Sequence, residues 1–363
     1  MVAPGPEPSG GGQGERQLRV PAAPLKPAPA TPGSGTGLLC SAAYREHDTG
    51  AWHPECPARV DAVIQGLERA GLLSRCQLIP PRPATERELL RCHTPQYLQR
   101  VQEDILAGRD QLSTGDTAVS RHSERTARLA AGGVLAAVEA VMEGRVRQAF
   151  AVVRPPGHHA SATRGMGFCI YNNVAIAARH LQAMHGLERI LIVDWDVHHG
   201  NGTQDIFWRD PTVLFFSSHQ APFYPGSGTR LERGEGPGAG FTHNCPLPAG
   251  TTGAQLLAAW REELVHLAEA FSPQFVLISA GFDSRGGDPL GDFLLEDGDF
   301  AALTQLLLDI AADRADGRLV SVLEGGYDLA GLASASAAHV ATLLDGSVAG
   351  ERDRVTLSPS SLH

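Results

Sequence analysis

The chain of 363 residues lacks the cysteine patterns that organise disulfide-rich and cysteine-ligated zinc domains. Its six cysteines are scattered and none forms a CxxC pair, so we expect neither kind of site. No run of about 18 apolar residues occurs, and the N-terminus lacks a basic start followed by an apolar stretch. These absences argue against membrane insertion and export, and they favour a cytoplasmic location with reduced thiols.

A basic signature is also missing. The formal net charge of −10 gives no support for direct nucleic-acid binding, although it would favour the approach of cationic substrates. Hydrophobic residues make up 42% of the chain, which is enough to fill a sizeable core, and 41 glycines with 25 prolines indicate many loops. The composition therefore predicts a loop-rich globular enzyme.

Composition divides the chain into three segments. Residues 1–36 are rich in Pro, Gly and Ala and carry few large apolar side chains, so they are predicted to form a disordered tail. Residues 37–346 are predicted to form one domain, and the polar residues 347–363 a flexible C-terminal tail.

Within the central segment, short β-branched runs alternate with longer Ala- and Leu-rich stretches. The runs predict buried strands over 149–153, 189–195, 212–218, 274–280 and 318–324. The stretches predict helices over 123–144, 172–185, 252–270 and 299–315. Such alternation predicts an α/β fold with a mostly parallel central sheet and helices on both faces.

Each predicted strand is followed by a polar cluster. In chain order the clusters are RPPGHH, DVHHGNG, SSHQAPFYPGSG, GFDSRGGDPLG and EGGYD. Ligands of open parallel sheets bind beyond the carboxyl ends of the strands, so the five clusters are expected to meet at one edge.

The cluster after the second predicted strand suggests a metal site. Asp194, Asp196 and His198 alternate there, which predicts that they point to the same side. Zinc binds imidazole and carboxylate groups, and a catalytic zinc site has three protein ligands. Asp283 is the best candidate for the third ligand and Asp288 its nearest competitor. A surface pair and a loop or cap residue would explain any one motif alone, but their joint arrival at one edge favours a metal site.

Two further clusters suggest acid–base and oxyanion chemistry. His158 and His159 follow two prolines and a glycine in a rigid turn, where a neutral imidazole could shuttle a proton. Tyr327 follows two glycines, and its phenol could stabilise an oxyanion. The alternatives are turn histidines without a role and a tyrosine packed at a strand end.

Together, the motifs resemble those of the histone deacetylase family in order and spacing. The resemblance runs from about Gly37 to Gly346 and is carried by PPGHH, DWDVHHGNGTQ, SAGFD, DPLG and EGGYD. It implies a three-layer, arginase-like α/β fold. The wording of GFDSRGGDPLG and HHGNGTQ is closer to class II and bacterial members than to class I.

The resemblance also implies roles for the metal and catalytic residues. Asp196, His198 and Asp283 match the zinc ligands of the family, and His158 and His159 match the tandem histidines beside the reacting water.

The same resemblance implies the reaction chemistry. Tyr327 would bind the substrate carbonyl, and His159 would take a proton from the water that attacks the carbonyl carbon. Asp194 matches the aspartate behind the first histidine. Asn201 stands behind the second, where class I members carry an aspartate, so His159 is expected to be oriented but less strongly polarised.

The implied substrate channel involves five residues. Asp116 matches the aspartate that holds the backbone of an acetyl-lysine peptide, with a helix cap as its rival role. Phe168, beside Gly167, and Tyr224 match the aromatic walls of the lysine channel, although either ring could be ordinary core. Leu290 stands where the polyamine-selective eukaryotic branch has a glutamate.

A structural potassium site is implied by analogy alone. Its matching positions are Asp194, Asp196, His198, Ser217 and Ser218.

The expected function is therefore zinc-dependent hydrolysis of the acetyl amide of acetyl-lysine in proteins, releasing acetate and a free amine. Leu290 offers no charge to a polyamine ammonium, which favours this substrate over acetylpolyamines or other small acetylated amines. A non-catalytic acetyl-lysine reader is the alternative of another class, and Tyr327 argues against it. An arginase-like manganese enzyme is disfavoured because one DxH and one further aspartate supply a single metal. The sequence leaves the physiological substrate and the oligomeric state open.

Overall fold

A computed structural model describes residues 1–2 and 35–355 of the chain. Within this part, one sheet has eight strands in the order β2-β1-β3-β8-β7-β4-β5-β6. In chain order the strands are β1 (Thr36–Leu39), β2 (Gln77–Ile79), β3 (Gln148–Ala151), β4 (Ile190–Asp194), β5 (Val213–Gln220), β6 (Thr242–Leu247), β7 (Phe275–Ala280) and β8 (Leu319–Leu323). Every pairing is parallel, so all the carboxyl ends meet at one edge of the sheet.

Five of these strands, β3, β4, β5, β7 and β8, are those predicted from the sequence. The other three, β1, β2 and β6, were not predicted. Two of them, β2 and β6, form the edges of the sheet, and edge strands need less continuous hydrophobicity. β6 also contains Pro246, a residue that is tolerated in a sheet mainly at its edge.

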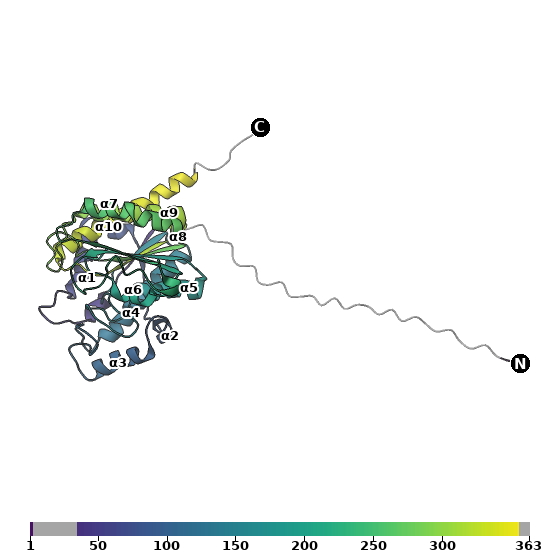
Figure 1. The fold of residues 1–363 in the computed structure, drawn as a ribbon, viewed down its shortest axis with the longest axis horizontal. Coiled ribbons are helices and arrows are strands. Elements are labelled where there is room, and N and C mark those ends of the chain that lie inside the picture. Colours follow the sequence, from purple (N-terminus) through teal and green to yellow (C-terminus); the bar gives the residue numbers. More distant parts are fainter. Residues whose placement is uncertain (3–34, 356–363) are drawn as a thin grey trace, which may run out of the picture.

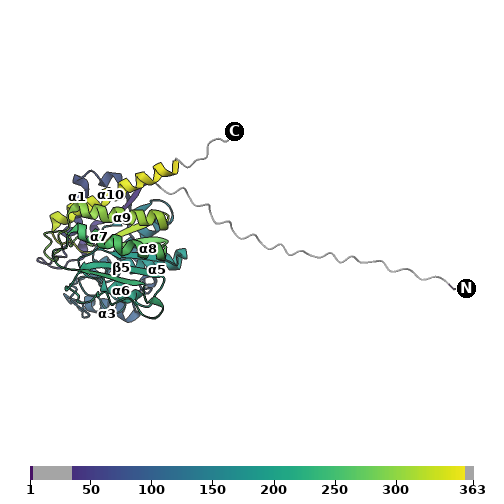
Figure 2. The same cartoon turned by 45° about the horizontal axis from the view of Figure 1, so that its top comes forward.

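Helices cover both faces of the sheet, which gives the predicted three layers (Figures 1 and 2). The helices are α1 (Ala58–Arg69), α2 (Glu86–Leu89), α3 (Pro95–Leu106), α4 (Ser123–Met142), α5 (Asn173–His185), α6 (Asn201–Phe207), α7 (Gly253–Glu262), α8 (Leu264–Phe271), α9 (Asp297–Arg314) and α10 (Leu329–Val355). One layer contains α1, α7, α9 and α10, and the other contains α4, α5 and α6 (Figure 1). No helix in the described part has the length and hydropathy needed to cross a membrane.

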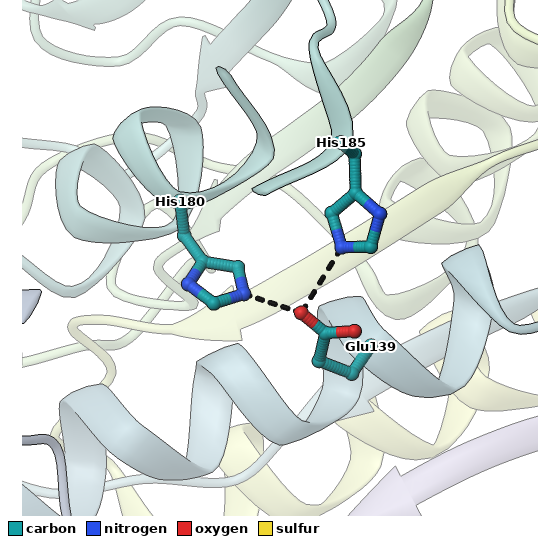
Figure 3. Close-up of side chains that lie close together, drawn as sticks. All are labelled: Glu139, His180 and His185. Atoms are coloured by element: carbon teal, nitrogen blue, oxygen red, sulfur yellow. Dashed lines mark hydrogen bonds and ion pairs between the residues drawn. The ribbon is translucent and has the colours of Figure 1, made fainter. Parts of the chain in front are cut away.

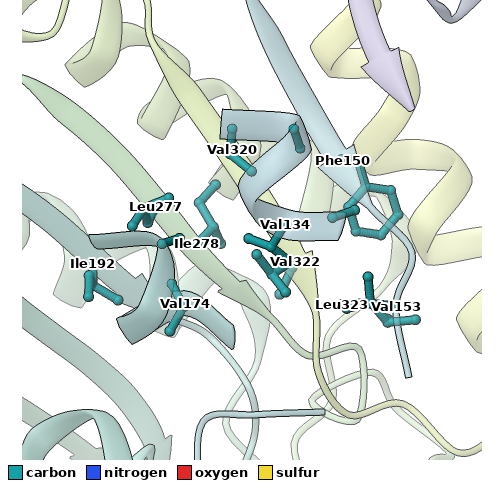
Figure 4. Close-up of a cluster of buried hydrophobic side chains, with 14 of the residues drawn as sticks. Val134, Phe150, Val153, Val174, Ile192, Leu277, Ile278, Val320, Val322 and Leu323 are labelled. Atoms are coloured by element: carbon teal, nitrogen blue, oxygen red, sulfur yellow. The ribbon is translucent and has the colours of Figure 1, made fainter. Parts of the chain in front are cut away.

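The core lies between the central strands and the helices packed on them (Figure 4). Phe150 of β3, Ile192 of β4 and Leu277 of β7 are fully buried. Val134 of α4 and Val174 of α5, also fully buried, belong to the same cluster. Each such side chain contributes about 1.5–3 kcal/mol through burial. The core thus fixes the strands whose ends carry the polar clusters.

Helices α1, α2, α3, α6 and α10 were not predicted from the sequence, and two predicted segments differ in the structure. The helix predicted over 252–270 is interrupted at Glu263, whose carboxylate accepts two hydrogen bonds from Arg230 (both 2.9 Å), so it becomes α7 and α8. Helix α10 runs past Gly346 into the predicted C-terminal tail, as far as Val355. Good helix formers occur there and proline appears only at Pro359. The rest of that tail, 356–363, and residues 3–34 of the N-terminal tail lie outside the described residues.

Candidate active site

A pocket of about 430 Å³ opens at the carboxyl edge of the sheet. The loops after the five predicted strands each contribute to its wall. These contributions are His159 after β3, His198 after β4, Tyr224 after β5, Leu290 after β7 and Tyr327 after β8. The five polar clusters therefore meet as the parallel arrangement predicted.

Asp196, His198 and Asp283 form a buried group beside this pocket. The Nδ1 atom of His198 lies 3.0 Å from Asp196 Oδ1 and 3.2 Å from Asp283 Oδ2. The three potential ligand atoms lie within 4.8 Å of one another. Two segments that are far apart in the sequence thus provide a compact set of two carboxylates and one imidazole.

The electrostatics of this group fit a divalent cation. Burial, and then the nearby charge of Asp196, raise the pKa of Asp283 to about 7. Burial alone would lower the pKa of His198, but its hydrogen bonds to Asp196 and Asp283 outweigh burial and raise the pKa to about 10. Two buried carboxylates therefore share one imidazole as their nearest positive charge. A zinc ion would supply the positive charge that the group lacks.

Two aspartates considered for this group have other partners. Asp194 is the last residue of β4, so Asp196 and His198 lie beyond the strand alternation on which the same-side prediction was based. The carboxylate of Asp194 lies 3.0 Å from His158 Nδ1. Asp288 accepts hydrogen bonds from the backbone amides of Tyr327 (2.6 Å), Leu290 (2.9 Å) and Asp328 (3.0 Å). It is thus a turn-stabilising residue, and Asp283 is the one beside His198.

Gly325 leaves the space that the two carboxylates occupy. A Cβ atom at this position would lie 2.0 Å from Asp283 Oδ2 and 2.6 Å from Asp196 Oδ2. The amide of Gly325 donates a hydrogen bond to Asp196 Oδ2 (2.8 Å). The first glycine of EGGYD therefore allows the backbone to approach the two carboxylates closely. The sequence interpretation did not predict this role.

The tandem histidines are held by different partners. The Nδ1 atom of His159 lies 2.7 Å from Asn201 Oδ1, at the start of α6. Since an amide oxygen only accepts, Nδ1 carries the proton and Nε2 is free to act as a base. Burial, followed by the charges of His158 and His198, lowers the pKa of His159 well below its usual value. For His158, the carboxylates of Asp196 and Asp194 outweigh burial and raise the pKa well above its usual value.

Tyr327 is held in the pocket wall by its ring and its backbone. The guanidinium of Arg59 lies 5.0 Å from the ring centroid, and the ring of Phe168 meets it edge to face at 5.9 Å. Burial, then the charge of Asp283, raises the pKa of Tyr327 well above its usual value. The phenol therefore remains a hydrogen-bond donor at neutral pH.

The predicted channel residues also line the pocket. Asp116 accepts hydrogen bonds from the Gly167 amide (2.7 Å) and the Tyr224 hydroxyl (3.0 Å). The residue at the N-cap of α4 is His122, so Asp116 does not cap that helix. Gly167 has a φ of 56°, and a Cβ atom there would lie 2.2 Å from the ring of His159. Phe168 and Tyr224 face the pocket.

The serines of the predicted potassium site are buried near β4. The hydroxyl of Ser218 accepts from Trp260 Nε1 (3.0 Å) and lies 3.5 Å from the Asp194 carbonyl oxygen. The hydroxyl of Ser217 lies 2.9 Å from His219 Nδ1. The potassium site remains a prediction.

An ion network that sequence reasoning missed supports the tyrosine turn. Arg59 donates to the carbonyl oxygens of Gly326 (2.7 Å) and Glu324 (2.5 Å). It also donates to Glu55 (3.0 Å), which accepts from Arg154 as well (2.7 Å). Glu55, Arg59 and Arg154 are fully buried. The spacing of Glu55 and Arg59, four residues apart, was the available signal, but such pairs are common on helix surfaces.

The Glu55→Gln variant is expected to lose about 3–5 kcal/mol of unfolding free energy, because it leaves two buried guanidinium groups without their carboxylate. Burial alone would raise the pKa of Glu55, but Arg154 outweighs it and the pKa is lowered. The ionised form therefore stabilises the fold at neutral pH, and this contribution is lost as the pH falls through the lowered pKa. Urea unfolding at pH 7 measures the effect.

The control is Glu235→Gln, which breaks the exposed pair of Glu235 and Arg209 (3.0 Å). Its midpoint should stay near that of the wild type, because exposed ion pairs contribute little. Equal midpoints for the Glu55 and Glu235 variants would contradict the importance of the buried network.

Comparisons with known proteins agree with this architecture. Residues 53–343 match the model of the protein family described as the histone deacetylase domain. The chain is 41% identical over 326 residues to Histone deacetylase 5 of Arabidopsis thaliana, covering 85% of this chain and 49% of that protein. It is 45% identical over 302 residues to Polyamine deacetylase HDAC10 of Mus musculus, covering 80% and 45% of the two. The chain thus spans about half the length of these two relatives.

Two further matches cover most of both partners. A probable deacetylase of Archaeoglobus fulgidus is 39% identical over 298 residues, which is 82% of each protein. The crystal structure of the HDA15 HD domain matches with a TM-score of 0.81 and 37% identity, over 86% of this chain and 90% of that one. The arginase- and deacetylase-like three-layer fold is therefore confirmed, and the chain belongs to the histone deacetylase family.

Proposed function

We propose that this chain catalyses zinc-dependent hydrolysis of the acetyl amide of acetyl-lysine side chains in proteins. The observation that carries the proposal is that His159, His198 and Tyr327 line one pocket, while Asp196 and Asp283 contact His198 beside it. The membership of the chain in the histone deacetylase family supports the same reaction class.

In this proposal, Asp196, His198 and Asp283 hold the zinc ion. When bound, zinc supplies a Lewis acid for the acetyl carbonyl and a lowered pKa for a water molecule. The phenol of Tyr327 donates a hydrogen bond to the carbonyl oxygen as negative charge develops there. The Nε2 atom of His159 accepts a proton from the attacking water, because Asn201 holds the proton on Nδ1, and returns it to the amine nitrogen as the C–N bond breaks. His158 shapes the electrostatics through Asp194.

The channel residues bind and orient the substrate. Phe168 and Tyr224 offer ring faces to the aliphatic lysine stem, which gains burial without polar partners. Asp116 lies at the exposed side of the pocket, where its carboxylate can accept backbone amides of a peptide. Leu290 completes the apolar wall.

The proposal is tested by measuring acetate release from an acetyl-lysine peptide and from acetylspermidine, with and without a chelator. Activity on the peptide that is lost on chelation and restored by Zn²⁺ is the expected result. Activity indifferent to chelation would contradict the role of the metal. Binding of the peptide without acetate release would instead support the non-catalytic reader.

A second candidate function is deacetylation of acetylpolyamines, which the acidic mouth of the pocket favours. Asp292 and Asp116 are both exposed and both line the pocket. Asp292 is held by Gln220, which donates to its carboxylate (2.8 Å) and accepts from its amide (2.9 Å). Asp292 comes two residues after Leu290. It therefore offers a carboxylate close to the position at which Leu290 has only an apolar side chain.

The Asp292→Asn variant is expected to raise the KM for acetylspermidine about two- to fivefold, as an exposed ion pair allows. A neutral acetyl-lysine dipeptide should keep its KM, because it places no ammonium group near the rim. Steady-state kinetics on both substrates check this. Equal changes in the two KM values would exclude charge recognition by Asp292.

A further inference from the structure

A second group of side chains of the kinds that ligate metals lies on the helical layer formed by α4 and α5. Glu139 of α4 and His180 and His185 of α5 place one ligand atom each within 4.8 Å of one another. Both imidazoles direct Nε2 at the same carboxylate oxygen, Glu139 Oε1 (Figure 3). The separation is 3.0 Å for His185, and His180 is also in hydrogen-bond contact.

We propose that Glu139, His180 and His185 form a second divalent metal site, selective for borderline transition ions such as Zn²⁺. Two imidazole nitrogens and one carboxylate oxygen are a ligand set that zinc accepts. Ligands at zinc distances of about 2.0–2.2 Å lie roughly 3.3 Å apart in a tetrahedron. Glu139 Oε1, which is at hydrogen-bond distance from both nitrogens, would therefore move outward only slightly. Mg²⁺ and Ca²⁺ prefer oxygen ligands and would not compete.

The site is open enough for an ion and a water ligand to enter. The side chains of Glu139 and His185 are 26% and 21% exposed, whereas His180 is 4% exposed. The group therefore has one anchored imidazole and two ligands that reach solvent. A fourth coordination position can be filled by water from that side.

Arg91 competes with the ion. Its guanidinium lies 2.7 Å from His180 Nδ1 and can only donate, so Nδ1 accepts and Nε2 carries the proton that points at Glu139. Metal binding needs the lone pair of Nε2, so the proton must move to Nδ1 and Arg91 must withdraw. Glu88 Oε1, 3.9 Å from Nδ1, is then the carboxylate that can accept the Nδ1 proton.

The start of α5 connects this group to the active-site loop. Asn172 donates to the Ala160 carbonyl oxygen (3.0 Å), and Asn173 donates to that of Pro155 (3.2 Å). These carbonyls flank the tandem histidines. An ion that joins α4 to α5 would therefore stabilise the support of the catalytic loop without contacting substrate.

The test uses the full, tag-free chain with one equivalent of zinc already bound, and measures a second equivalent by calorimetric titration with Zn²⁺. Wild-type protein should bind it and gain about 5 °C in Tm at a hundredfold excess over Kd. Glu139→Gln and His185→Asn should each lower the affinity for the second equivalent of Zn²⁺ at least tenfold. Arg91→Gln should strengthen it, because a glutamine oxygen can accept the Nδ1 proton.

The matched control is His266→Asn, which changes an exposed histidine 3.7 Å from Glu269. The affinity of this variant for the second equivalent of Zn²⁺ should match that of the wild type. Unaltered circular dichroism of the metal-free variants establishes that they fold. Absence of a second equivalent, its persistence in the Glu139 and His185 variants, or equal weakening by His266→Asn would overturn the proposal and leave a hydrogen-bonded contact between two helices.

Discussion

The Asp283→Asn variant is expected to retain far less than one equivalent of zinc at the deacetylase site and to lose deacetylase activity on the order of 10³-fold. The amide is a poor zinc ligand, and loss of several kcal/mol of transition-state stabilisation corresponds to a change of this size. The substitution keeps the shape of the side chain. Its oxygen can still accept the amide of Val197, which donates to Asp283 Oδ1 at 2.9 Å.

The same variant separates metal binding from folding. Burial and the charge of Asp196 raise the pKa of Asp283, so its ionised form destabilises the metal-free protein. Metal-free Asp283→Asn should therefore melt no lower than metal-free wild type. Only the wild type should gain Tm when zinc fills the deacetylase site.

Asp292→Asn provides the control, because Asp292 lies on the rim of the pocket and outside the buried group. It should keep its zinc and its activity on neutral substrates. An Asp283 variant that keeps both zinc and activity would refute the proposed ligand set.

The Tyr327→Phe variant is expected to lower kcat about 10²- to 10³-fold while leaving KM and zinc content nearly unchanged. A donor that acts on the developing oxyanion contributes more to the transition state than to substrate binding. Phenylalanine keeps the ring next to Arg59 and Phe168, so the turn should be preserved. Single-turnover rates with saturating acetyl-lysine peptide measure the effect on chemistry.

Tyr224→Phe is the matched control. It removes the hydroxyl that donates to Asp116 (3.0 Å) and keeps a ring in the channel wall. Its kcat should change less than that of Tyr327→Phe, and its effect should fall mainly on KM. If both variants lower kcat equally, the phenol of Tyr327 has no special role at the carbonyl.

Much of this architecture could be predicted because it depends on local sequence patterns. Strands such as β4 and β7 are largely apolar runs, and a carboxylate residue follows within a few positions of each strand end. The sequence alone therefore places Asp196 and Asp283 at one edge of the sheet. The short strand β2, two of whose three residues are exposed, carries no such pattern.

The remainder depends on contacts between distant segments. Glu55 accepts a hydrogen bond from Arg154, 99 residues away, and no sequence pattern around either residue predicts this contact. Asp194 and Asp196 are two residues apart and the strand ends between them, so sequence alternation does not specify that His158 Nδ1 meets Asp194 while His198 Nδ1 meets Asp196. Glu139 and His180 lie on separate helices, so their contact depends on helix packing that sequence periodicity does not specify.

The position of β1 bears on how a recombinant fragment should be cut. The family match begins at residue 53, but β1 covers Thr36–Leu39 and pairs with β2 on one side and β3 on the other. A fragment trimmed to the family match would expose the flank of β3 as an open edge and detach β2, inviting self-association between copies. An expression boundary should therefore be placed upstream of Thr36.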